Sequence, residues 1–288
     1  MKRKLGVFDL VNGLIMLLIT ITMIYPFWYV LCYSLSDMGM TGGNQLLLWP
    51  RGFRLDSYQV AFSNSTIIHG FFISVARSVL GPLLMLIISG MAAYVLSKNE
   101  LIGVKWIRRF MFFSMYVSAG LLPGYILIRT LGLTGSFWVY VLPSVANVFN
   151  IVLIRAYIET LPPGLEESAT IDGASYFTVF SRIVLPLCVP VLAAVTLYAC
   201  VGQWNSYIDA QLYNYRNPEL YPVQYILYNY IAVKAPTKEA SSAAQGLITT
   251  AHSLRMSVTV ITTIPILLVY PFLQKYFASG LLVGAIKA

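Results

Sequence analysis

The chain has 288 residues, of which 58% are hydrophobic and only 10% are charged, and its formal net charge is +8. Soluble domains carry about 25% charged residues, so this composition excludes an ordinary soluble enzyme and indicates an integral membrane protein. Lysines and arginines at the inner membrane face account for the positive charge, and no compact basic domain predicts a nucleic-acid partner.

Six stretches free of Asp, Glu, Lys and Arg predict six transmembrane helices. Each stretch contains between 19 and 27 residues, against the roughly 20 that cross the hydrocarbon core of a bilayer. The expected fold is therefore all-α and integral to the membrane. In chain order the stretches are 10–36, 78–97, 110–128, 130–154, 183–208 and 256–274.

Lysine and arginine in the short loops set the expected orientation, because positive charge resists translocation. The N-terminal Lys2-Arg3-Lys4 and the turn 98–109, which carries four cations, both belong inside. This topology places both termini and residues 155–182 in the cytoplasm and leaves 34–66 and 209–255 outside. The first uncharged run exceeds the 7–15 residues of a secretory signal, which predicts an uncleaved anchor.

Arg77 lies well inside a helix if the apolar stretch 67–76 belongs to the second span. A charge there is costly unless it meets water or a partner. We expect its side chain to reach the outer interface, and the alternative is a charge that faces a substrate path. Further on, Pro123 and Pro143 each remove a backbone hydrogen bond and favour kinks in spans three and four, which the glycine-bearing turn 131–135 joins as a tight hairpin.

Four of the eleven carboxylates gather in residues 159–190, a segment unlike the rest of the chain. Pro162-Pro163-Gly164 ends the preceding helix, and two glutamates then lie in the first turn of a new one, where they meet the positive end of the helix dipole. That helix should end near Gly173, since glycine favours a left-handed conformation at a helix C-terminus, and a second should follow over 174–182. Such a two-helix elbow suits docking into a groove of another protein, although a structural loop has the same pattern.

Within this segment Glu167-Ser168-Ala169, Gly173 and Ile183-Val184-Leu185-Pro186 stand at a recognisable spacing. The segment resembles the EAA motif of ATP-binding cassette importer permeases, with Ser168 in place of the middle alanine of the family pattern. The resemblance implies a type I ABC importer permease fold and a cytoplasmic loop that docks onto a separate ATPase subunit. The residues implied in this ATPase-coupling loop, 159–186, are Glu166, Glu167, Ser168, Ala169, Asp172, Gly173, Ile183, Leu185 and Pro186.

The resemblance covers a core permease domain over about 67–288, with five spans and the coupling loop. Residues 1–66 precede it and hold the N-terminal tail, the first span and an outer loop. The run 272–287 is similar to the end of the maltose-type permease that lacks a long extra domain. Trp204-Asn205-Ser206-Tyr207 with Asp209-Ala210 resembles permeases for oligosaccharides and aldouronates. These likenesses imply uptake of a carbohydrate, an oligosaccharide in this subgroup.

The resemblance also implies partners at the bacterial cytoplasmic membrane. They are an ATPase dimer that binds ATP and magnesium, a second homologous permease in a heterodimer, and an extracytoplasmic solute-binding protein that meets the outer loop 209–255. The chain itself is expected to hold no cofactor and to be no enzyme, because it has no Gly-x-x-x-x-Gly-Lys-Ser/Thr phosphate loop and no Gly-x-Ser-x-Gly or His-Glu-x-x-His site.

Two further expectations concern metals and energy coupling. No metal site is expected, because Cys32, Cys188 and Cys200 stand apart in apolar stretches. A gradient-driven secondary transporter is the alternative function, but it usually requires a mid-span carboxylate or histidine relay, which this sequence does not provide.

Sugars are bound by aromatic faces and by amide or carboxylate hydrogen bonds, so we expect the substrate path at polar and aromatic residues inside the spans or at their outer ends. Asn147 and Asn150, three apart, should share one helical face, with bonding between helices as the alternative. For Trp204 and Tyr207 the alternative is an aromatic belt at the membrane interface. The candidates are Asn147, Asn150, Tyr198, Gln203, Trp204, Asn205, Tyr207 and Asp209.

Overall fold

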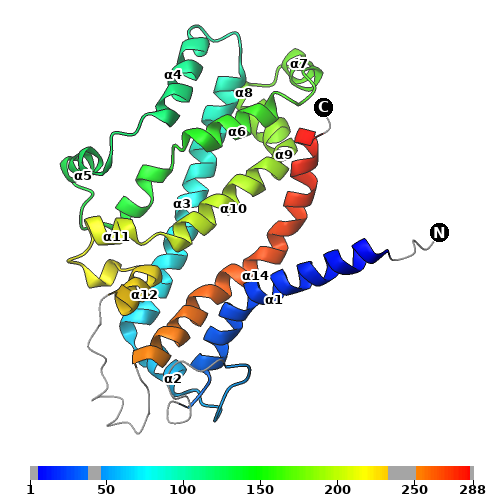
Figure 1. Cartoon of the computed structure of the whole chain (residues 1–288). Helices are drawn as coiled ribbons and strands as arrows, with labels where there is room; N and C mark the ends of the chain where they lie inside the picture. The colour runs from blue at the N-terminus through cyan, green and yellow to red at the C-terminus, as the bar shows by residue number, and fades with distance from the viewer. Residues whose placement is uncertain (1–5, 38–46, 233–250, 286–288) are drawn as a thin grey trace. The chain divides into compact units, whose positions relative to one another are not determined.

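Helices form the regular structure of this protein. The computed structural model describes residues 6–37, 47–232 and 251–285, and within these ranges it contains helices and no strand, as the sequence predicts (Figure 1). The helices are α1 (Val7–Ser34), α2 (Asp56–Ser63), α3 (Ser65–Ser97), α4 (Val104–Tyr116), α5 (Leu121–Thr130), α6 (Val148–Ile158), α7 (Gly164–Ile171), α8 (Tyr176–Val179), α9 (Leu185–Leu187), α10 (Val189–Asn205), α11 (Ile208–Tyr213), α12 (Val223–Ala232) and α14 (Ala251–Ala285), with 3₁₀ turns η1 (Phe137–Tyr140), η2 (Leu142–Ser144) and η4 (Pro218–Leu220) and a π-helix, η3 (Phe180–Val184).

Three of the described helices are long and apolar enough to cross a membrane. They are α1 with 28 residues, α3 with 33, and the 18-residue stretch His252–Val269 of α14. Three pairs of shorter helices meet the same criterion only together, so the described residues provide three spans, or up to six if each pair is one span. The count of six and the cytoplasmic side of the termini stay predictions, and residues 1–5 and 286–288 lie outside the described ranges.

The segments expected as spans three, four and five are all bent. α4 and α5 meet at 117°, the η1–η2 segment and α6 at 42°, and the α8–α9 segment and α10 at 79°. Pro143 lies in η2 at the second bend, and Pro190 lies in the first turn of α10 after the third. The first bend falls before Pro123, at Gly120, whose φ of +87° is a conformation that glycine adopts without a steric penalty.

The chain divides into two compact units, the first of which comprises Met1–Ile67 and Leu227–Pro265. In this unit side chains hold α2 against the end of α1. The hydroxyls of Ser34 and Tyr58 are 2.7 Å apart, and Ser57 Oγ donates to the Ser34 carbonyl at 2.9 Å. Polar side chains thus satisfy groups at a helix end that the helix itself leaves unpaired.

The second unit comprises Ile68–Ile226 and Ile266–Ala288. Its apolar core joins α3, α6 and the segment from α8 to α10, and includes Met85, Ala93, Tyr94, Ile151, Ile154, Val184, Leu192 and Val195. Gly70 lets α3 approach the turn before α12 closely, since a Cβ there would lie 2.9 Å from the Tyr221 carbonyl oxygen. This unit contains both the predicted coupling loop and the substrate-path candidates.

Candidate functional site

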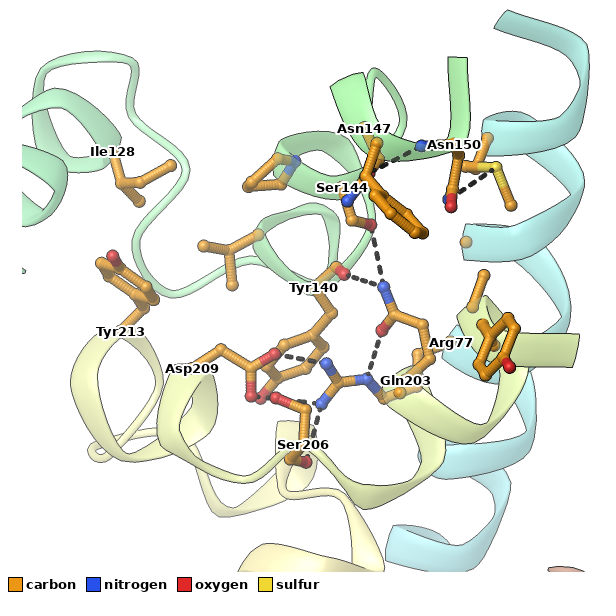
Figure 2. A pocket seen from close by; sticks show the side chains of 18 residues that line it. Arg77, Ile128, Tyr140, Ser144, Asn147, Asn150, Gln203, Ser206, Asp209 and Tyr213 are labelled. Atoms are coloured by element: carbon orange, nitrogen blue, oxygen red, sulfur yellow. Dashed lines mark hydrogen bonds and ion pairs between the residues drawn. The ribbon is translucent and has the colours of Figure 1, made fainter. Parts of the chain in front are cut away.

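A cavity of about 590 Å³ lies in the second unit, among α3, α6, α10 and α11. Ligand pockets in proteins typically enclose about 300–1,000 Å³ and combine apolar walls with a few polar groups. The wall here has that character, with aromatic rings, amides and one ion pair that converge in Figure 2. The aromatic and amide residues are Tyr140, Phe149, Tyr198, Tyr213, Asn147, Asn150 and Gln203.

Arg77 brings a buried positive charge to this wall, with only 1% of the residue exposed. Its Nη1 donates to Asp209 Oδ1 and to the Ser206 carbonyl, both at 3.2 Å, and its Nη2 makes a salt bridge to Asp209 Oδ2. The guanidinium also lies over the Tyr140 ring, 4.4 Å from its centre. The expectation that Arg77 reaches the outer interface is wrong, because Asp209 supplies the counter-charge inside the fold.

Gln203 connects this ion pair to the bend before α6. Its Oε1 accepts from Arg77 Nε at 2.9 Å, and its Nε2 donates to the Tyr140 carbonyl and to Ser144 Oγ, each at 2.9 Å (Figure 2). Gly81 of α3 leaves room for it, because a Cβ at that position would lie 3.0 Å from Gln203 Nε2. A buried amide with all these partners satisfied holds α3, α10 and the 3₁₀ turns in one arrangement.

Five of the eight predicted substrate-path residues line the cavity: Asn147, Asn150, Tyr198, Gln203 and Asp209. Asn147 does not lie within a helix but caps α6, since its side chain accepts from the backbone N–H of Asn150 at 3.1 Å. The Asn150 amide is 3.4 Å from the Met85 sulfur of α3, so it also makes the contact between helices that the sequence left open. Both residues therefore lie at the start of α6.

The other three candidates do not line the cavity. Trp204 is buried, and its ring packs edge-on against Phe71 with the ring centres 5.6 Å apart. Asn205 accepts from Gln224 Nε2 at 3.1 Å, and Tyr207 precedes the first turn of α11. Their contact with substrate stays a prediction.

The cavity wall also includes Tyr140, Ser144 and Tyr213, which no sequence pattern predicted. The first two lie in short 3₁₀ turns on either side of a proline, where no periodicity marks an inward face. Tyr213 stacks on Tyr125, with ring centres 5.7 Å apart and planes 8° from parallel. The dense run of tyrosines near α11 is the signal that could have indicated it.

The predicted coupling loop forms the expected helix, turn and helix. Glu166 and Glu167 lie in the first turn of α7. Gly173 has a φ of +82°, its N–H donates to the Thr170 carbonyl, and the next N–H donates to the Ala169 carbonyl, both at 3.0 Å. This is the bonding pattern of a Schellman motif with glycine in the left-handed position. The predicted end of the helix at Gly173 is confirmed.

The remaining motif residues lie on successive short elements. Ser168 Oγ donates to the Gly164 carbonyl at 2.8 Å within α7, and Asp172 is the C-cap residue of that helix. Ile183 belongs to the π-helix η3, whereas Leu185 and Pro186 begin α9. A π-turn of this kind is rare and occurs frequently at functional sites.

The elbow, residues 164–187, has two distinct faces. Ala169 and Ala174 pack against the apolar core of the second unit. Ile171 is 86% exposed, and Tyr176 and Phe177 are each 70% exposed. These three were not predicted from the sequence, although they are apolar residues on both sides of the glycine that ends α7 in an acidic segment. Exposed aromatic and aliphatic side chains on a fixed turn are common features of surfaces that bind other proteins.

Comparison with known proteins places these features beside transport systems. Residues 98–283 match the family described as "Binding-protein-dependent transport system inner membrane component". The chain is 34% identical over 288 residues to the polygalacturonan/rhamnogalacturonan transport system permease protein YtcP of Bacillus subtilis (strain 168), covering 100% of both chains. It is 35% identical over 281 residues to Protein LplC of the same strain, covering 98% of this chain and 95% of that protein.

A solved structure shows the same fold. It is a bacterial ABC transporter involved in the import of the acidic polysaccharide alginate, and one of its chains is 27% identical to this one. The two superpose with a TM-score of 0.87, covering 96% of this chain and 99% of that chain.

Proposed function

The chain belongs to the family of binding-protein-dependent transport system inner membrane components, and from this membership we propose that it is the permease subunit of an ATP-binding cassette importer for an oligosaccharide. The resemblance to importer permeases and the type I permease fold, both predicted from the sequence, are confirmed. The family consists of membrane components of transport systems and not of enzymes. Relatives named for polygalacturonan, rhamnogalacturonan and alginate support a saccharide as the substrate.

One observation carries the coupling part of this proposal: the elbow presents Ile171, Tyr176 and Phe177 to solvent on a turn fixed by Gly173. Aromatic side chains contribute most when they enter a pocket on a partner, since each buries about 150–250 Å². A helix pair of this kind fits a groove on a separate ATPase subunit. In this arrangement the ATPase dimer binds ATP and magnesium, and this chain holds no cofactor.

The remaining partners complete the importer at the bacterial cytoplasmic membrane. A second, homologous permease pairs with this chain as a heterodimer, and an extracytoplasmic solute-binding protein delivers the sugar. The family description itself names transport that depends on a binding protein. The outer loop 209–255 is the expected contact for it, and residues 233–250 of that loop lie outside the part that the structure describes.

The cavity beside α10 is proposed as part of the substrate path. Its rings and amides match the chemistry that binds sugars, namely aromatic faces and hydrogen-bonding groups. Among the described residues that line it, Arg77 is the only cation and is already paired with Asp209, so this lining offers polar groups without net charge. Sugar hydroxyls are the groups best suited to such a wall.

The decisive experiment is co-purification of this chain with its candidate ATPase and permease subunits. Gly173→Trp should abolish binding of the ATPase, because the indole obstructs the surface of the elbow that docks. The substitution also places a non-glycine residue in the left-handed region, at a cost of about 1–2 kcal/mol. Gly103→Trp is the matched control, since Gly103 also has a positive φ, +81°, and open space around it. Phe177→Ser removes an exposed apolar side chain without backbone strain and should weaken the same complex.

Loss of the ATPase from the Gly173→Trp and Phe177→Ser complexes, with the permease pair intact and the Gly103→Trp complex complete, supports the proposal. Unchanged ATPase binding in both variants, together with sugar uptake that an uncoupler abolishes, overturns it and favours the gradient-driven alternative.

A further inference from the structure

The C-terminal end of α3 contacts both helices of the elbow through four side chains. Lys98, directly after α3, makes a salt bridge to Glu166 in the first turn of α7. Its ammonium lies 4.4 Å from the centre of the Tyr94 ring, and that ring lies 5.1 Å from the ring of Phe180 in η3. Lys98, Tyr94, Glu166 and Phe180, which we call the α3–elbow cluster, thus connect one long helix to both parts of the coupling loop.

The cluster is partly shielded from solvent. The side chains of Lys98 and Glu166 are 20% and 26% exposed, and Tyr94 is buried. An ion pair in such surroundings is screened less by salt than a fully exposed pair, and a cation over an aromatic face adds further attraction. Lys105, on the same predicted side of the membrane, is exposed in contrast. The shielding favours a persistent contact between α3 and α7.

Independent bonds hold the same end of α3 against α4. Arg108 Nε donates to the Leu96 carbonyl at 2.8 Å, and its Nη1 donates to Asn99 Oδ1 at 2.8 Å. The side of α3 that faces α4 is therefore fixed without Lys98. Lys98 supplies the ion pair on the side that faces the elbow.

The same helix forms part of the cavity wall. Met85 of α3 lines the cavity and contacts Asn150. It precedes Ser97, the last residue of α3, by 12 positions, which is about 18 Å along a helix. Pro82 lies outside this stretch, so an unbroken run of helix links the cluster to the wall.

We propose that Lys98 and Tyr94 are positioning residues for the coupling of ATP hydrolysis to transport. They hold Glu166 and Phe180, so the elbow and α3 move as one body when the ATPase acts on the elbow, and this motion reaches the cavity wall. The inference rests on the proposed function, because it requires an ATPase that acts on this loop. It does not involve the exposed Phe177 face, so the role of the cluster is separable from docking.

The test uses Lys98→Gln and Glu166→Gln, with Lys105→Gln as the control for loss of a nearby lysine. The importer is reconstituted in proteoliposomes with its ATPase, second permease and binding protein, and ATP hydrolysis and sugar uptake are measured together. Lys98→Gln, which lies outside the coupling loop, should retain the ATPase subunit and hydrolyse ATP, while uptake per ATP falls about fivefold or more in both variants. Lys98→Arg, and the exchange of Lys98→Glu with Glu166→Lys, should recover uptake per ATP to within about twofold of wild type, because each restores an ion pair.

Uptake per ATP equal to that of Lys105→Gln in both variants overturns the proposal, and so does an exchange variant as defective as the single ones. Amide hydrogen exchange of residues 164–187, measured on the purified full chain without ATPase, separates this failure from that of the proposed function. Faster exchange in Lys98→Gln than in Lys105→Gln supports the α3–elbow cluster even where no ATP-driven uptake is found. Equal exchange in the two variants counts against it whatever the transport activity.

Discussion

Replacing Arg77 by leucine tests whether the buried ion pair holds α3 to the start of α11. The change removes the donors that Arg77 supplies to the Asp209 carboxylate, the Gln203 Oε1 and the Ser206 carbonyl, and leaves Asp209 Oδ1 with the Ala210 N–H. Breaking a buried ion pair costs about 3–5 kcal/mol. The Asp209 side chain is 21% exposed, so water offsets part of this loss. We therefore expect the free energy of unfolding to fall by about 2–3 kcal/mol.

The measurement is the free energy of unfolding in mixed micelles, followed by tryptophan fluorescence. Arg129→Leu is the control, because Arg129 is exposed and its loss should change stability by less than about 0.5 kcal/mol. The double variant Arg77→Leu/Asp209→Leu should be more stable than the sum of the single changes predicts, by about 1–3 kcal/mol. Additive effects, or an Arg77→Leu protein as stable as Arg129→Leu, would refute the reasoning.

Two further predictions concern the cavity wall. Gly81→Val should displace Gln203 and lower the free energy of unfolding by about 1–3 kcal/mol. The control Gly124→Val, at a position with no neighbour within 4 Å, should lower it less in the same unfolding measurement. Equal losses in the two variants would contradict the close packing of Gly81 against Gln203. Tyr198→Ala should raise the KM of uptake about fivefold with little change in maximal rate. The control Tyr116→Ala, at a residue that is 87% exposed and away from the cavity lining, should leave the KM unchanged. An unaltered KM in Tyr198→Ala would remove Tyr198 from the substrate path.

The all-helical fold and the elbow could be predicted because both depend on local sequence. Uncharged runs long enough to cross a bilayer identify membrane helices without reference to the rest of the chain. The end of α7 is set locally by the left-handed φ of Gly173 and by the hydrogen bonds that the N–H groups of Gly173 and Ala174 donate, which join residues at most five positions apart. Resemblance to a family motif then predicted docking onto an ATPase for this local structure, and this role stays a prediction.

Only the tertiary structure decided what happens to Arg77 and where the cavity lies. Arg77 and Asp209 are 132 residues apart in the chain, so no spacing rule indicates that they meet. Taken alone, a charge inside a membrane helix is expected to reach the interface, but packing of α3 against α10 and α11 provides a carboxylate and an amide that solvate it internally. Sequence determines which segments form helices, whereas the partners of a buried charge depend on how those helices pack.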